Sequence, residues 1–456
     1  MSEKSISEVI AQWAAGLEIT DLPTEVREAV ANTVTDTVAL SIASVDTDYG
    51  EAVRDASRTS GECTVFGASE KRSAYEAALI NGTTAHGEDF DNTYEGCPVH
   101  SGVVIVPALF AAGEADGLLS DRVALGMAVG IEVMCRLGAA AKKSVHSQGF
   151  HPTSVLGTVA AAVGVGVARG YNTRQLADAM GVAASFSSGI IEYLGDGSWT
   201  KRIHAGWAAQ CGIRAADMGG AGFFGPRGVF EGTHGLFAAF GPSIEPDFET
   251  FIEGLGSRWE AARVAFKPYA CGTMTQPFID CAVRLAQRAV DWREIEEITC
   301  SVGEGTVHRL WEPLTDKQNP PTPYAAKFSG PYTVASGLRF GGAGLAQFTR
   351  ESIADEGLLS VSNKVRYIVD PDDEYPENYT GTVVVKLRDG SEHREFQGQL
   401  RGGMREPMTG DDLRAKCQDN LAFADWRGAD ASAIDSFAHA LFDNRKRFDA
   451  TLLRRI

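Results

Sequence analysis

Apolar residues recur at helical spacing through most of the first 260 positions of the chain. The clearest examples are three Ala-rich segments at residues 25–44, 103–117 and 121–140, where apolar side chains return every three or four positions. Turn-forming sequences separate such segments, as in the Gly-rich run GGAGFFGPRG that follows Met218. The pattern predicts a large all-helical region.

The pattern changes in the last third of the chain. EIEEITCSVGEG has a strand-like core, and TGTVVVKLRDGSEHREFQG predicts a β-hairpin with its turn at Asp389-Gly390. A helix is expected between them, from about Pro331, and residues from Thr409 onward return to helical spacing. We therefore expect a smaller α+β unit over residues 266–400, followed by C-terminal helices.

Composition and charge narrow the class of protein. The 456 residues are 44% hydrophobic and 22% charged, which is typical of a globular protein. The formal net charge of −18 argues against a nucleic-acid or anionic-membrane partner, because such partners recruit clustered Lys and Arg. Eight scattered cysteines without a C-x-x-C pair, and a start without a cationic leader, predict a cytoplasmic protein with reduced thiols.

Candidate chemistry lies in a few histidine and lysine segments. The histidines are found in GCPVHSGV (His100), SQGFHPTS (His151) and WTKRIHAG (His204). Lys201 lies in the last of these segments, and Lys267 lies where the helical pattern gives way to the α+β unit. Removing a proton next to a carboxylate requires a base such as histidine and cations that stabilise the resulting charge. The chain contains both residue types.

The same and neighbouring segments allow other interpretations. A single loop histidine is more often structural than catalytic. His86, Glu88, Asp89 and Asp91 could hold a divalent metal, but their nearly consecutive spacing favours ion pairs or hydrogen bonds. Ser198-x-x-Lys201 matches one element of penicillin-binding enzymes, whose companion motifs are absent.

Five motifs taken in order resemble one family. They are NGTTAHGEDFDNTYEG with the following His100, then GFHPTSVLGT, TKRIHAGWAAQCGIRAA, FKPYACGTMTQPFIDCA and AKFSGPYTVASGL. Together they resemble the MmgE/PrpD family, which includes 2-methylcitrate dehydratase, cis-aconitate decarboxylase and iminodisuccinate epimerase. The resemblance extends to about Gly342 and is weaker beyond it.

The resemblance implies a protein that is mainly α with a second, smaller α+β domain. A large helical domain would comprise residues 1–265 and 405–456, and the smaller domain, a lid, residues 266–404. It also implies a homodimer without metal, iron–sulfur cluster or organic cofactor, with its site between the domains.

The same motifs imply roles for individual residues. His100 and His151 would handle protons, Lys201 and Lys267 would hold substrate carboxylates, and Tyr332 would orient substrate or relay a proton. Asp89 and Thr93 would contact substrate, and His204 would contact or support it. In the decarboxylase branch a histidine follows five positions after the second lysine, where this chain has Gly272.

These implications favour a lyase that dehydrates a 2-methylcitrate-like hydroxy acid by removing a proton next to a carboxylate. The substrate would be a small anionic polycarboxylate. The alternative is an epimerase of an iminodisuccinate-like polyacid. A cis-aconitate decarboxylase is less favoured because of Gly272, and a non-catalytic binding scaffold is the remaining, distant alternative. Which of His100 and His151 is the acid and which the base stays open.

Overall fold

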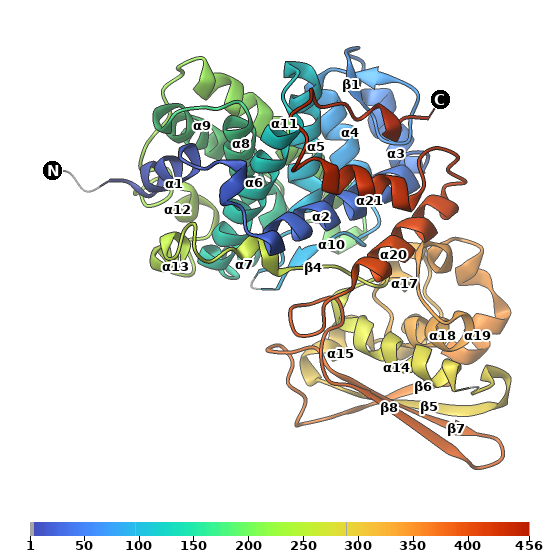
Figure 1. The fold of residues 1–456 in the computed structure, drawn as a ribbon. Coiled ribbons are helices and arrows are strands. Elements are labelled where there is room, and N and C mark those ends of the chain that lie inside the picture. Colours follow the sequence, from blue (N-terminus) through green and yellow to red (C-terminus); the bar gives the residue numbers. More distant parts are fainter. Residues whose placement is uncertain (1–3, 96, 289, 456) are drawn as a thin grey trace. The chain divides into compact units, whose positions relative to one another are not determined.

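The chain forms two units, each packed around its own core. The computed structural model describes residues 4–95, 97–288 and 290–455. One unit comprises Met1–Gly87, Asp91–Ala265 and Gly410–Ile456, and the other Glu88–Phe90 and Phe266–Thr409. Helices dominate the first unit, and the second combines helices with a four-stranded sheet (Figure 1). The predicted class, mainly α with a smaller α+β part, is confirmed.

The first unit is a helical assembly drawn from both ends of the sequence. Its helices are α1 (Ile6–Ala15), α2 (Thr24–Ser44), α3 (Asp48–Ala56), α4 (Ala74–His86), α5 (Gly102–Asp116), α6 (Ser120–Ala141), α7 (Ser144–Ser147), α8 (Pro152–Ala168), α9 (Thr173–Phe186), α10 (Tyr193–Asp196), α11 (Thr200–Gly220), α12 (Leu236–Phe240), α13 (Phe248–Ile252), α20 (Gly410–Phe423) and α21 (Ala431–Ala440). The C-terminal helices α20 and α21 pack on α2 (Figure 1).

Helix α8 lies at the centre of this unit, and all of its residues are buried. It packs against α5, α6, α9 and α11. Its small residues permit this, because a Cβ on Gly164 would lie 2.7 Å from the carbonyl oxygen of Gly126 in α6. Helix α6 is long and apolar enough to cross a membrane, but 94% of its most apolar window is buried inside the protein. We therefore read α6 as a core helix.

Two short antiparallel pairs also belong to the first unit, and the all-helical prediction missed them. They are β1 (Cys63–Thr64) with β2 (Lys71–Arg72), and β3 (Thr93–Tyr94) with β4 (Val264–Ala265). Strands of two residues are too short to produce a visible alternation of apolar and polar positions.

The second unit is built on a mixed sheet of order β6-β5-β7-β8. Its strands are β5 (Ile295–Val302), β6 (Val365–Val369), β7 (Gly381–Leu387) and β8 (Glu392–Gln397), and its helices are α14 (Gln276–Gln287), α15 (Glu304–Leu310), α16 (Leu314–Gln318), α17 (Pro323–Ala326), α18 (Gly330–Phe340) and α19 (Glu356–Ser362). The predicted hairpin is confirmed as β7–β8, with Gly390 at a φ of 87° in its turn. Helices α14 and α18 pack together, and α14 covers β7 and β8.

Candidate active site

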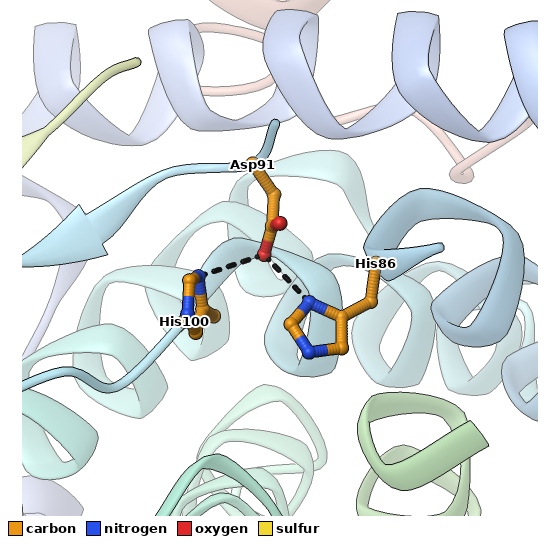
Figure 2. Close-up of side chains that lie close together, drawn as sticks. All are labelled: His86, Asp91 and His100. Carbon is orange, nitrogen blue, oxygen red and sulfur yellow. Dashed lines mark hydrogen bonds and ion pairs between the residues drawn. The ribbon is translucent and has the colours of Figure 1, made fainter. Parts of the chain in front are cut away.

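Two buried histidines of the first unit share one carboxylate. His86 is the last residue of α4, and Asp91 and His100 lie between α4 and α5. The Nδ1 atoms of His86 and His100 each lie 3.0 Å from the same carboxylate oxygen of Asp91. Figure 2 shows this oxygen between the two rings. The side chains of His86 and Asp91 are fully buried, whereas that of His100 retains 8% of its exposure.

A close helix crossing positions this group. A Cβ on Gly82 of α4 would lie 2.6 Å from the Cα of Gly206 in α11, so only glycines allow the two helices to approach this closely. His86 follows Gly82 by one turn, and His204 precedes Gly206 by two residues. The crossing therefore brings the end of α4 and the beginning of α11 into the same region.

The shared oxygen acts as a hydrogen-bond acceptor. His86, Asp91 and His100 offer ligand atoms within 4.8 Å of one another, a spacing that a metal ion could also use. However, Nδ1 of His100 lies 3.0 Å from the carbonyl oxygen of Asn92 as well as from Asp91. An atom flanked by two oxygen acceptors carries a hydrogen, because a bare lone pair there would be repelled by both. The arrangement therefore fits hydrogen bonds better than metal ligation.

Burial and charge act in opposite directions on Asp91. Burial alone raises the pKa of this carboxyl, but the charges and hydrogen bonds of His100 and His86 hold the pKa well below its usual value. Burial also lowers the pKa of His86, and the attraction of Asp91 offsets only part of that effect. Asp91 is consequently ionised and His86 neutral at pH 7.

A second pair of histidines lies beside the first. His151 precedes α8 as its N-cap residue, and its backbone N–H donates to the carbonyl of Gly189 at 2.8 Å. Its Nδ1 lies 3.2 Å from Nδ1 of His204, so one ring donates and the other accepts. The rings of His86 and His151 stack with centroids 5.6 Å apart and an interplanar angle of 18°.

No carboxylate contacts the His151–His204 pair among the hydrogen bonds and ion pairs of the described residues. Burial, with the charges of His86 and Lys201, holds the pKa of His151 well below its ordinary value. The same causes lower the pKa of His204 to about 4. Both rings are therefore neutral at pH 7. Lys201, the second residue of α11, supplies positive charge to this cluster.

A pocket of about 510 Å³ opens beside His204 in the first unit. Its walls combine apolar, hydroxyl and acidic side chains, and they comprise Ser188, Gly189, Ile190, Glu192, Tyr193, Asp196, Ser198, Thr200, Ile203, His204 and Trp207. Tyr193 also contacts the rings of His151 and His204 edge-on, with centroids 6.2 and 5.9 Å away. The pocket thus reaches the second histidine pair directly.

The second unit pairs two buried lysines with residues of its short segment Glu88–Phe90. Lys267 donates to the backbone carbonyl and the carboxylate of Asp89, at 2.8 and 3.0 Å. Lys327 contacts the carbonyl and the carboxylate of Glu88, each at 2.8 Å. With the His86–Asp91 hydrogen bond, these two ion pairs match the interpretation of this acidic segment as a source of ion pairs or hydrogen bonds.

Three other residues singled out in the sequence have local contacts outside the histidine group and the lysine pairs. Tyr332 in α18 is fully buried and donates its hydroxyl to the carbonyl of Gln347 at 2.6 Å, and burial raises its pKa. Thr93 is half-buried in β3, opposite Ala265 of β4. Gly272 donates its N–H to the carbonyl of Lys327.

The structure thus groups some of the sequence candidates and separates others by unit. His100, His151 and His204 gather in the first unit with Lys201, and Lys267 and Asp89 bond to each other in the second. Asp91 and His86 were missed as partners of His100. Their signal was present, since both belong to the acidic and histidine-containing segment that was considered for metal binding.

Two family descriptions match most of the chain. Residues 8–249 match the MmgE/PrpD N-terminal domain, and residues 269–434 match the MmgE/PrpD C-terminal domain.

Individual relatives are more distant. The chain is 25% identical to the cis-aconitate decarboxylase-like protein oryM of Aspergillus oryzae, over 95% of this chain and 92% of that protein. It is 26% identical to the cis-aconitate decarboxylase of Homo sapiens, over 92% and 89%. It is 27% identical to the cis-aconitate decarboxylase of Aspergillus terreus, over 63% and 61%.

Proposed function

Because the chain belongs to the MmgE/PrpD family, we propose that it is a cofactor-independent lyase that dehydrates a small hydroxy polycarboxylate of the 2-methylcitrate type. A C–H bond next to a carboxylate breaks and its proton moves to a histidine. The electron pair forms a C=C bond, and the C–O bond breaks. The departing oxygen takes up the proton that the histidine received and leaves as water, so that the enzyme ends the cycle as it began.

The observation that carries the proposal is the buried group of His86, Asp91, His100, His151 and His204. Neutral imidazoles accept protons near pH 7, and one carboxylate stabilises the imidazolium that forms. Water is largely excluded from these side chains, which strengthens each electrostatic contact.

Cations for substrate carboxylates would come from Lys201 and Lys267. Lys201 already influences the histidines through its charge. Lys267 is bonded to Asp89, so a substrate carboxylate would have to share or replace that partner. In a chain with a net charge of −18, such cations are the groups that favour a polyanionic ligand.

Decarboxylation is the second candidate, because relatives that align with most of this chain are named cis-aconitate decarboxylase. In that reaction the C–C bond to a carboxylate breaks and CO2 leaves. The electron pair that stays behind takes up a proton, so a histidine would act as proton donor. Gly272 weighs against it, since the decarboxylase branch has a histidine there. A Cβ at this position would lie 3.0 Å from the Phe328 ring, so a histidine there would require that ring to move.

A panel of polycarboxylates monitored by NMR in deuterated water distinguishes the candidates. A new alkene without loss of carbon supports dehydration, and release of CO2 supports decarboxylation. Deuterium incorporation at the substrate carbon without an alkene supports the epimerase. If no acid reacts and none raises the melting temperature, the proposal fails in favour of a non-catalytic scaffold.

A further inference from the structure

We propose that Asp91 and His86 are positioning residues that make His100 the base of the proposed reaction. In this assignment Asp91 fixes the hydrogen of His100 on Nδ1 and leaves Nε2 bare to accept the substrate proton. His86 shares the same carboxylate oxygen and fixes its direction. This assignment rests on the proposed function. It adds Asp91 and His86 to the proposed site, and it identifies His100 rather than His151 as the base.

The tautomers follow from the contacts of Nδ1. In His100 this atom faces Asp91 and the Asn92 carbonyl, each at 3.0 Å, and in His86 it faces Asp91 at 3.0 Å. An ionised carboxylate and a carbonyl are acceptors only, so both Nδ1 atoms carry hydrogens. A neutral imidazole with its hydrogen on Nδ1 has a bare Nε2. In the neutral form of either ring, Nε2 is therefore the nitrogen that accepts a proton.

Accessibility decides which of the two rings accepts the proton. The His86 side chain is fully buried, and its Nε2 has no hydrogen-bond partner, so a second proton there would be a buried N–H without an acceptor. The His100 side chain retains 8% of its exposure. Its backbone N–H also donates to the hydroxyl of Thr153 in α8 at 3.2 Å, which holds the ring's segment in place.

The surrounding charges favour His100 over His151 as the base. Three other ionisable groups act on this cluster, namely His151 before α8 and Lys201 and His204 of α11. A further charged pair, Asp36 of α2 with Lys416 of α20, has its charged atoms 2.7 Å apart. Lys416 compensates Asp36 directly. Among the described residues, Asp91 is then the carboxylate that contacts the histidines of this cluster. His100 touches that anion, whereas His151 contacts another histidine and lies under the influence of Lys201.

In the proposed proton transfer, the charge that forms on His100 is compensated by Asp91. The C–H bond next to the substrate carboxylate breaks, its electron pair stays on carbon, and the N–H bond forms at Nε2 of His100. The imidazolium then lies against the ionised Asp91, so the step moves charge onto a site that already contains its counter-charge.

Ring-nitrogen NMR of the histidine-15N-labelled full chain tests the tautomers without any substrate. His86→Gln and His100→Gln variants identify the two rings by loss of their signals. We expect both rings to carry hydrogen on Nδ1. A hydrogen on Nε2 of His100 would overturn the proposal, and so would a metal-shifted Nδ1 signal together with one equivalent of bound metal. This result does not depend on whether the proposed reaction is correct.

Kinetics of Asp91→Asn test the consequence for catalysis. We expect kcat to fall by about 10²–10⁴-fold with KM little changed, and the acidic limb of the kcat/KM profile to move to lower pH. The sign follows because a carboxylate stabilises the imidazolium, so its loss lowers the pKa of the base.

Asp178→Asn is the matched control, because it neutralises another buried carboxylate of the first unit that contacts no histidine. It should leave the position of the limb unchanged. A fall in activity of Asp91→Asn with an unmoved limb would reduce Asp91 to a purely structural role and overturn the proposal. If Asp91→Asn does not fold, the tautomers of the wild-type protein decide.

Discussion

The first unit shares one carboxylate between two histidines, whereas the second unit gives each buried lysine a carboxylate of its own. Lys267 is matched with Asp89 and Lys327 with Glu88, and each lysine also bonds to a backbone carbonyl. A one-to-one ion pair stabilises one conformation, because removing either charge would leave the other buried without its counter-ion. A carboxylate shared by two histidine rings can stabilise a proton that one of the rings takes up. We infer that the lysine–carboxylate pairs of the second unit stabilise its structure, whereas the histidine group of the first unit is suited to proton exchange.

Replacing the proposed base should produce the largest effect. We expect His100→Gln to lower kcat by about 10³-fold or more, because glutamine keeps the size and polarity of the side chain but cannot accept a proton. Steady-state kinetics on the substrate found in the NMR panel measure it. His439→Gln serves as the control, since His439 is partly exposed and pairs with Glu28. Activity of His100→Gln near that of the control would contradict the role of the histidine region.

Breaking a matched pair should mainly reduce stability. Lys267→Met leaves the Asp89 carboxylate buried without its cation, and we expect a loss of about 3–5 kcal/mol in the free energy of unfolding. Urea denaturation measures it. The double variant Lys267→Met/Asp89→Asn should recover part of the loss. A single variant as stable as the wild type would mean that the pair does not hold this region.

The histidine region should make stability depend on pH. The folded-state pKa of His204 is about 4, below the ordinary 6.5, so between these values the unfolded chain binds more protons. Stability therefore falls as pH drops from about 6.5 to 4, by up to about 3 kcal/mol for this group. His86 and His151 act in the same direction. Chemical denaturation across this range should show a shallower slope for His204→Gln than for the wild type.

Removing the neighbouring cation should have the smallest effect. Lys201 contributes to the low pKa of His204, but burial is the larger cause. In Lys201→Met the pKa of His204 should rise and still stay below 6.5, as measured by NMR titration of the ring. Arg202→Met, one position along the same helix, is the control and should leave that pKa unchanged. A fall of the pKa in Lys201→Met would contradict the assigned electrostatics.

The sequence predicted the fold well where patterns are long. Segments such as α2, α5, α6 and the β7–β8 hairpin have enough residues for their periodicity to identify them. The pairs β1–β2 and β3–β4 escaped, because two residues make no period. The hydrophobic pattern also could not predict that α6 packs on α8 at Gly126 and Gly164, because the tertiary structure determines which helices meet at a glycine.

The site could be predicted residue by residue but not contact by contact. Motif order indicated His100, His151, Lys201 and Lys267, and their catalytic and binding roles stay predictions. The sharing of Asp91 by two rings was invisible, because it depends on how the loop after α4 folds back over its own helix end. Likewise, nothing local in the sequence predicts that Tyr332 donates its hydroxyl to Gln347.

The segment Glu88–Phe90 has a consequence for how such a protein can be divided and recombined. Three residues from the first hundred positions belong to a unit whose remaining members begin at Phe266. A fragment cut at 266–409 would leave behind the acids that neutralise Lys267 and Lys327, and two buried ammonium groups would lose their counter-ions. The unit is therefore not a module that can be exchanged between relatives as one continuous stretch. Any such graft has to carry this tripeptide with it.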